Sequence, residues 1–397
     1  MHFSFWEVRG MLAGHDAVVV GAGIVGLTAA TAFKRMHPGA SVAVVDADPF
    51  SGGGTTRNAG FACFGSASEL EADRAQLGDE RALQLVKRRV RGLAALRARW
   101  SDEALGYVDC GSHEVLGGAA GFPAWGAQAG EPVEAEALRG RLPELNRWVQ
   151  PATGLVETFG WVGAKEAAGR YGVNPEVVEG LIASPGEGAL QTDRLFHCLE
   201  QEARETGVKI WRGLQVDALE SGDNGRSPRW RVRRVGSPAE EGMTLEAGCI
   251  LVANNGLAQQ LLARSGAEVP DVQPVRNRVL VTHPIPGWQA PGTYHADRGY
   301  LYAREVEGRL LIGGGRHWEL GAMDLEAELL RWAETVWPAT RGAKIAYRWD
   351  GYLGIGGERE PIVTTWMPGI HIAVRLGGMG VAIGTDLGRE LAALSAC

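Results

Sequence analysis

Residues 16–46, DAVVVGAGIVGLTAATAFKRMHPGASVAVVD, decide the fold of this chain. An apolar run, 17–20, is followed by a glycine-rich turn, by a segment with helical periodicity and by a second apolar run, 42–45. This order predicts a strand, a turn, a helix and a second strand, the unit in which a helix joins two parallel strands. The first part of the chain is therefore expected to be an α/β domain.

The three glycines of this turn are spaced as in a dinucleotide-binding fingerprint. In such a unit Gly21 makes the tight turn, Gly23 lets a pyrophosphate approach the backbone, and Gly26 permits close packing of helix on strand. The N–H groups and the positive dipole end of the helix then face the phosphates. Asp46 ends the second strand, where a carboxylate can accept hydrogen bonds from an adenosine ribose. The stretch therefore predicts a dinucleotide site.

Composition narrows the possible partners. With 397 residues the chain is long enough for two domains, and its net charge of -7 argues against nucleic acid or an anionic membrane as a partner. No apolar run reaches the roughly 18 residues of a membrane span, and the N-terminus lacks the pattern of a signal peptide. The five cysteines are scattered without a CxxC pair, so neither a disulfide framework nor a metal site is indicated. We expect a cytoplasmic protein that binds a small molecule.

The periodicity of the apolar residues changes twice along the rest of the chain. Helical spacing extends over residues 68–100, residues 107–171 are broken by Gly and Pro and predict short strands with irregular connections, and 188–207 contains a helix before further strands. From residue 275 the period becomes two, with a hairpin at Glu307-Gly308, which predicts a separate and mainly antiparallel sheet. A helix over 325–337 follows. The end of the chain repeats the strand–turn–helix order of the first unit, with a strand at 370–376, a glycine turn at 377–380 and a helix over 381–394.

These pieces together resemble the D-amino acid oxidase type of FAD-dependent oxidoreductase, the family of glycine oxidase, sarcosine oxidase and D-amino acid dehydrogenases. The resemblance covers nearly the whole chain. It is carried by the glycine fingerprint, by Thr55-Thr56-Arg57-Asn58-Ala59-Gly60, by 252–256, by the strand that runs into Gly313-Gly314-Gly315, by 347–351 and by Gly377-Gly378-Met379-Gly380.

The resemblance implies a fold with two domains. A Rossmann-like FAD-binding domain of the glutathione-reductase type is expected from residues 1–105, 175–274 and 350–397. An α+β substrate domain with a mainly antiparallel sheet is expected from 106–174 and 275–349. The fold class is thus α/β with a discontinuous nucleotide domain.

The resemblance also implies which residues bind FAD: Gly21, Gly23, Ile24, Val25, Gly26, Asp46, Thr55, Thr56, Arg57, Asn58, Ala59, Val216, Asn254, Gly378, Met379, Gly380 and Val381. Three departures from the family pattern matter. Leu353 stands where members acting on small amino acids often carry arginine, and Met379 stands where many have histidine. No cysteine lies between Cys249 and Cys397, so FAD is expected to be non-covalent.

The implied reaction is oxidation of a C–N bond of a small amine or amino acid by hydride transfer to the flavin, giving an imine that hydrolyses, with O2 or a quinone as electron acceptor. A period of two places Tyr300, Tyr302 and Arg304 on one strand face, where phenols and a guanidinium would suit a carboxylate. These are the candidate catalytic residues, with a substrate-positioning role. The alternative is that this face is exposed or packs on another strand.

Two other functions stay open at this level: an NAD(P)-dependent dehydrogenase, and a non-catalytic binding protein with an FAD fold. Against the nicotinamide enzyme, the chain has a single GxGxxG and continues into the Thr-Thr-Arg-Asn loop and a second glycine turn. The sequence names neither the substrate nor the oligomeric state.

Overall fold

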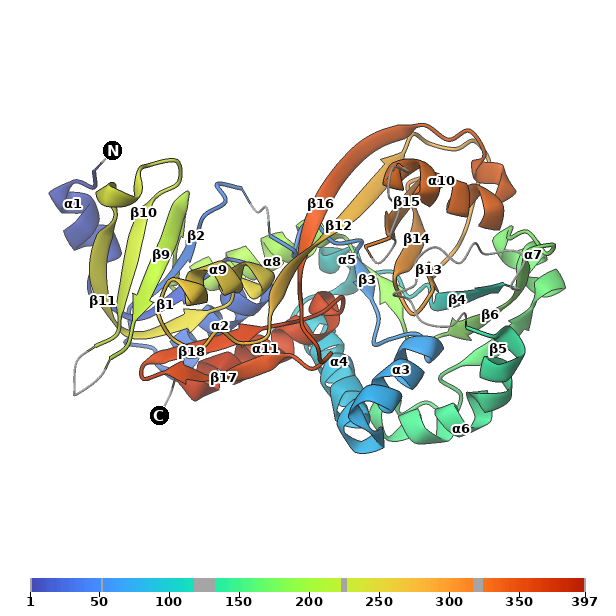
Figure 1. The fold of residues 1–397 in the computed structure, drawn as a ribbon, viewed down its shortest axis with the longest axis horizontal. Helices are drawn as coiled ribbons and strands as arrows, with labels where there is room; N and C mark the ends of the chain where they lie inside the picture. Colours follow the sequence, from blue (N-terminus) through green and yellow to red (C-terminus); the bar gives the residue numbers. More distant parts are fainter. Residues whose placement is uncertain (1, 51–52, 118–132, 223–226, 317–323, 396–397) are drawn as a thin grey trace.

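The computed structural model describes residues 2–50, 53–117, 133–222, 227–316 and 324–395. Within these ranges the strands form two large sheets and one small one, and the large sheets lie at opposite ends of an elongated molecule (Figure 1). In the same ranges no helix combines the length and the apolar character needed to cross a bilayer.

The first sheet is built on the glycine-turn unit, in the strand order β17-β18-β11-β1-β2-β8. Its strands are β1 (His15–Val20), β2 (Val42–Asp46), β8 (Lys209–Arg212), β11 (Met243–Val252), β17 (Ile362–Met367) and β18 (Ile370–Val374). All neighbours are parallel except β17, and β9 (Leu214–Glu220) and β10 (Arg229–Arg234) extend β11 as an antiparallel ribbon. The sheet therefore draws its strands from three separate parts of the chain.

Strand β1 is apolar throughout because both of its faces are covered. Val19 belongs to a core with α2 (Ile24–Met36), α8 (Thr192–Glu205) and α11 (Gly380–Leu394). Val18 and Val20 belong to the core on the opposite face, with β9, β10 and α9 (Ala258–Ala263). The continuous apolar run of the sequence thus has its cause in burial on two sides.

The second sheet has the order β16-β12-β15-β14-β13-β4-β6-β5, and its described neighbours are antiparallel except β13 and β4. Its strands are β4 (Ser112–Gly117), β5 (Gly160–Gly163), β6 (Val178–Ser184), β12 (Gln273–Thr282), β13 (Thr293–Ala296), β14 (Leu301–Val306), β15 (Arg309–Gly314) and β16 (Ile345–Ile355). Helix α10 (Leu325–Val336) packs on one face through Leu329 and Trp332. On the opposite face, Leu116 of β4 and Ile182 of β6 pack with residues of α3 (Ala67–Leu77), α4 (Asp79–Arg99) and α6 (Ala135–Thr153). The part of this face that borders a cavity, with Asn277, His295 and Tyr302, is called the uncovered face below.

The two sheets confirm the predicted fold class, a Rossmann-like domain from discontinuous segments with a mainly antiparallel partner. The predicted domain boundaries stay a prediction. Strand β6 lies within 175–274, which we assigned to the nucleotide domain, yet it pairs with β4 and β5 in the second sheet. The boundary at 350 falls inside β16, which pairs with β12 along its length.

One local expectation was confirmed and one was wrong. Residues 68–100 are helical, as two helices, because the chain turns at Gly78 with φ of 79° between α3 (Ala67–Leu77) and α4 (Asp79–Arg99). Part of 107–171 is helical, since α6 (Ala135–Thr153) continues through Pro143 and Pro151. Its buried leucine and valine side chains pack against α4 and β6, and this packing outweighs the helix-breaking tendency of proline.

The remaining elements are short: α1 (Phe5–Glu7), the π-helix η1 (Val8–Leu12), α5 (Asp102–Leu105), α7 (Ala164–Tyr171), the 3-10 helices η3 (Ala239–Glu241), η4 (Asn255–Leu257) and η5 (Pro338–Thr340), and the two-stranded pair β3 (Phe61–Ala62) and β7 (Gly188–Ala189).

The helices α2, α4 and α11 pack closely because glycines stand at their crossings. A Cβ atom on Gly92 of α4 would collide with the carbonyl oxygen of Ala382 in α11. A Cβ on Gly388 of α11 would lie 2.7 Å from Thr28 Cβ and from the Val25 carbonyl oxygen of α2. This packing holds α11, and with it the second glycine turn, against the first.

We expect Gly92→Ala to lower the free energy of unfolding by about 1–3 kcal/mol, because the added methyl group meets backbone that cannot move aside. The matched control is Gly140→Ala in α6, where a Cβ has nothing within 4 Å. That change should stabilise by up to about 1 kcal/mol through helix propensity. Denaturant unfolding measures both. Equal effects of the two substitutions would contradict the packing described.

Candidate functional site

One cavity of about 1750 Å³ extends from the first glycine turn to the uncovered face of the second sheet. Pockets for small molecules have about 300–1,000 Å³, so this one has room for a dinucleotide and a second molecule. Most of the predicted cofactor residues line it: Gly21, Gly23, Ile24, Val25, Asp46, Thr55, Arg57, Asn58, Ala59, Val216, Asn254, Gly378, Met379, Gly380 and Val381. The predicted residues Gly26, Thr56 and Arg304 are not in its lining.

The first glycine turn has the shape that the fingerprint requires. Gly21 has φ of 108°, and a Cβ there would lie 3.0 Å from the Ala253 carbonyl oxygen. A Cβ on Gly26 would collide with the Gly21 carbonyl oxygen. Gly26 therefore packs against the turn and does not line the cavity. Gly23 precedes α2 and offers no side chain to cap it. The N-terminus of α2 thus lies at the cavity, with Gly23, Ile24 and Val25 in its lining, as phosphate binding needs.

Asp46 is tied to the turn by hydrogen bonds that the sequence did not predict. Its Oδ2 accepts from the Ala22 N–H at 2.6 Å, and its Oδ1 accepts from the Asp48 N–H at 2.8 Å. Each carboxylate oxygen has a second lone pair. Asp46 can therefore hold the turn and accept from a ribose hydroxyl at the same time.

The loop after β2 is held together by hydrogen bonds from its own side chains. Ser51 and Gly52 lie outside the described residues. Asn58 Nδ2 donates to the carbonyl oxygens of Gly54 and Thr55, and its Oδ1 accepts from the Gly60 N–H. Thr55 Oγ1 accepts from the Ile24 N–H at 2.9 Å. Thr55 thus joins the loop to the start of α2.

At the other end of the cavity the second glycine turn leads into α11, with Met379 at the N-cap and no side-chain cap. Met379 Sδ lies 3.8 Å from Cys63 Sγ. Sequence reasoning missed Asn255, whose Oδ1 accepts from the Leu376 N–H at 3.2 Å and so ties this turn to the end of β11. The sequence feature that could have identified Asn255 is the Asn-Asn-Gly turn that follows a buried strand. Asn254 Oδ1 is buried and, among the described residues, has no hydrogen-bond partner.

The uncovered face of the second sheet presents a phenol to the cavity. Tyr302 on β14 lies over Gly313 of β15, where any Cβ would collide with the phenol oxygen. Asn277 Nδ2 on β12 donates to Tyr302 Oη at 2.5 Å. Burial raises the pKa of Tyr302 to about 12, so the hydroxyl keeps its proton at neutral pH. Sequence reasoning missed Asn277, and it noted Gly313 only as part of the glycine run.

The structure separates the three side chains that we expected on one strand face. Tyr300 lies before β14, in a turn in which Asp297 and Arg298 have φ of 50° and 52°. Tyr302 lines the cavity, whereas Arg304 Nη1 donates to the Gly60 carbonyl oxygen at 3.5 Å, behind the loop. The predicted placement of Arg304 in the substrate site was therefore wrong. The arginine beside the two tyrosines is Arg316, which follows β15 and lines the cavity.

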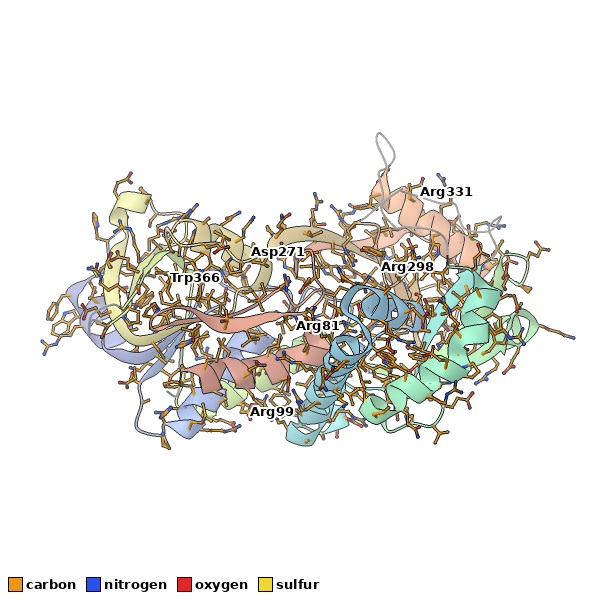
Figure 2. The ribbon with its side chains drawn as sticks, turned by 60° about the horizontal axis from the view of Figure 1, so that its bottom comes forward. Arg81, Arg99, Asp271, Arg298, Arg331 and Trp366 are labelled. Atoms are coloured by element: carbon orange, nitrogen blue, oxygen red, sulfur yellow. The ribbon has the colours of Figure 1, made fainter. Side chains whose placement is uncertain are left out.

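A crossing segment, residues 356–361, joins the two domains and also lines the cavity. On one side Gly357 O accepts from Gln76 Nε2 at 2.5 Å, and Arg81 pairs with Glu358 at 3.0 Å. On the other side the Gly357 N–H donates to Asp271 Oδ2 at 2.7 Å. Figure 2 shows Arg81 and Asp271 in the middle of the molecule, between its two ends. The crossing segment is thus held on two sides, by α3 and α4 and by the residues that precede β12.

Two buried carboxyl groups lie behind the cavity wall. Glu187 Oε1 accepts from the N–H groups of Phe64 and Gly65 at 2.6 and 3.0 Å. Glu114 Oε2 accepts from the Ser68 N–H at 3.0 Å. Burial raises the pKa of each group from its ordinary value near 4.5 to about 7. These carboxyl groups therefore hold the 61–68 segment, and each favours its protonated form below about pH 7.

Glu187 should make the stability of the protein depend on pH. Its folded-state pKa is raised, so its contribution is fully present below about pH 4.5 and is lost as the pH rises to about 7, where the folded form also ionises. We expect Glu187→Gln to reduce the fall in unfolding free energy between pH 5 and 7, by roughly 1–3 kcal/mol. The exposed Glu157 provides the control, Glu157→Gln, which should leave the slope unchanged. A Glu187 variant with the wild-type slope would disprove this origin.

Gly23→Val tests the phosphate cradle. A Cβ at this position would lie 3.1 Å from Thr55 Oγ1, so a branched side chain must project into the cavity in front of α2. We expect the variant to purify without the yellow colour of a bound flavin, while Gly39→Val, at a turn with nothing within 4 Å, should retain it. Absorbance near the visible flavin band measures both. Stoichiometric flavin in the Gly23 variant would show that the cradle lies elsewhere.

Solved structures with the same fold cover nearly all of this chain. Glycine oxidase from Geobacillus kaustophilus has a TM-score of 0.71 at 19% identity, over 96% of this chain and 94% of that one. Iminodiacetate oxidase from Chelativorans sp. BNC1 has a TM-score of 0.71 at 20% identity, over 96% and 95%. L-proline dehydrogenase from P. horikoshii has a TM-score of 0.71 at 18% identity, over 95% and 91%.

In sequence, a probable oxidoreductase, OrdL, from Rhizobium meliloti (strain 1021) is 24% identical over 396 residues, covering 96% of this chain and 82% of that protein. The family model DAO, FAD dependent oxidoreductase, matches residues 16–394. This span includes both glycine turns, both large sheets and the cavity between them, and it confirms the resemblance and the FAD cofactor. The chain belongs to the DAO family of FAD-dependent oxidoreductases.

Proposed function

We propose that this protein oxidises a C–N bond of an amino acid or a small amine with non-covalently bound FAD. The observation that carries the proposal is one continuous cavity, which has the dinucleotide cradle at one end and the polar face of the antiparallel sheet at the other. Nucleotide and substrate would therefore meet in one shared space.

The residues of the first domain fit FAD. The N-termini of α2 and α11 both lie at the cavity, and their N-cap residues, Gly23 and Met379, make no side-chain cap. At α2 the Thr55 hydroxyl accepts from the Ile24 N–H. Positive dipole ends of this kind favour phosphate at α2 and developing negative charge at α11. When bound, FAD supplies the acceptor for the hydride that leaves the carbon next to nitrogen. The protein's own task is then to orient the substrate and exclude water.

Non-covalent binding of FAD is supported by the raised pKa of the Cys63 thiol, which lines the cavity. Cys63 lines the cavity beside Met379, and burial raises its pKa well above the usual value. A thiol that stays protonated is a poor nucleophile. Cys397, the last residue, lies outside the described residues.

The second sheet supplies the polar groups that would position the substrate. Tyr302 accepts a hydrogen bond from Asn277, so its own proton is left to donate. Met379 has a thioether in place of the histidine that many family members have at this turn, and it offers no proton. Deprotonation of the amine is then assigned to solvent, and the imine product is hydrolysed by water to a carbonyl compound and an amine or ammonia.

The named reactions of structural neighbours support the same class of chemistry. The glycine oxidase and the iminodiacetate oxidase are named for an amino acid and for an amine with two carboxylates, and the proline dehydrogenase is named for a cyclic amino acid. At 18–20% identity these proteins share the fold with this chain. The identity of the substrate must therefore be inferred from the residues of this chain's own cavity. The family model names FAD, which disfavours the nicotinamide enzyme.

The test is an anaerobic reduction screen. The FAD-loaded protein is mixed without oxygen with single amino acids and with primary and secondary amines, and bleaching of the visible flavin band is followed. At least one compound should bleach the band within a turnover, and later addition of O2 or of a quinone should restore it and identify the acceptor. If dithionite reduces the bound FAD but no amine or amino acid does, the protein does not oxidise amines and the non-catalytic alternative gains support.

A further inference from the structure

We propose that Arg316 anchors a carboxylate of the substrate, which makes the substrate an amino acid or another carboxylated amine. This inference rests on the proposed function, and it assigns the anion site to the end of β15. The family position for a carboxylate-binding arginine, on β16, is Leu353 in this chain.

Arg316 is held on the cavity wall by its neighbours. The Gly315 N–H donates to the Tyr300 carbonyl oxygen at 3.1 Å, which fixes the backbone before Arg316. The Arg316 guanidinium carbon lies 4.3 Å from the centre of the Tyr300 ring. Stacking on an aromatic face orients a guanidinium and leaves its edge donors available for a carboxylate.

Arg316 differs from the neighbouring arginines in having no direct carboxylate partner. Three arginines of the cavity lining are paired: Arg89 with Asp73 at 3.1 Å, Arg359 with Asp73 at 3.2 Å, and Arg298 with Asp297 at 3.9 Å. Arg57, also in the lining, donates to the Asp350 carbonyl oxygen at 3.2 Å. Among the described residues, no carboxylate lies within 4.0 Å of an Arg316 nitrogen, and Glu69, the acidic side chain that acts on it through space, is itself 4.0 Å from Arg359. The buried Arg316 guanidinium thus has a distant, shared countercharge and no carboxylate of the described residues bound to it.

Burial makes that charge costly without an anion. Removal from water lowers the pKa of Arg316 below its ordinary value, yet an arginine stays protonated at neutral pH. A bidentate carboxylate would supply both the missing charge and acceptors for the edge N–H groups. The anion site therefore selects a substrate with one negative group close to the atoms that react.

Arg304, the arginine that the sequence predicted, and Arg348 on β16 do not meet these conditions. Arg304 lies behind the loop at Gly60, and Arg348 is exposed and pairs with Glu326 at 3.2 Å. Neither is in the described lining of the cavity. Arg348 is accordingly a matched control that removes the same charge elsewhere on the second sheet.

Binding of a small anion tests the anchor apart from turnover. Acetate and its neutral analogue acetamide are titrated into the FAD-loaded protein, and heat and the visible flavin spectrum are recorded. For Arg316→Met we expect the dissociation constant of acetate to rise about 10- to 100-fold, with acetamide unchanged. Arg316→Lys should restore part of the loss, because an ammonium cannot reproduce the fork. Arg348→Met should bind acetate like the wild type.

The outcomes separate this inference from the proposed function. If the wild type does not bind acetate, or if Arg316→Met binds it as tightly as the wild type, Arg316 is not the anchor even when an amine reduces the flavin. If the acetate results follow the expectation and no amine or amino acid reduces the flavin, the anion site stands and the proposed oxidation fails. A matching FAD content and unfolding temperature of each variant confirm that it is folded.

Discussion

The close approach of α2 to the end of β1 is the constraint on which the rest of the structure depends. The Gly21 carbonyl oxygen occupies the place that a side chain at residue 26 would need, so α2 can lie this close to the turn only with glycine at 26. The N-terminus of α2 then lies at the cavity, with no capping side chain on Gly23 and with the Thr55 hydroxyl on the Ile24 N–H. The Asp46 carboxylate then holds the turn from β2 through the Ala22 N–H. A phosphate site is thus a consequence of how helix and strand pack.

The second glycine turn depends on the first through helix packing. Helices α2, α4 and α11 meet at glycines, so α11 is held with its N-terminus toward the same cavity as that of α2. The crossing segment 356–361 leads from β16 of the second sheet to β17 of the first, and Gln76 and Asp271 hold it in place. The cavity is therefore a product of contacts between parts of the chain that are far apart in sequence, and its two ends can serve cofactor and substrate.

Much of the nucleotide site could be predicted from the sequence because it is local. Glycine spacing, a terminal acid and an apolar strand lie within one stretch of about thirty residues. The substrate wall could not be predicted, because it depends on register between strands. Tyr302 reaches Asn277 only because Gly313 lies between them on the neighbouring strand. Arg304 shares the alternation of Tyr302 but meets the Gly60 loop, which comes from a distant part of the chain. Helix α6 could not be predicted because the sequence contains two prolines there, which the packed helix accommodates.

The central claim is that one cavity holds FAD and substrate between the two glycine turns and the antiparallel sheet. A crystal structure of the FAD-loaded protein with acetate tests it most directly. The account predicts the pyrophosphate at Gly21 and Gly23, the flavin ring between the Met379 turn and Tyr302, and the acetate on Arg316. A flavin ring placed away from the antiparallel sheet, with Tyr302 and Arg316 on a wall that it does not reach, would contradict the account.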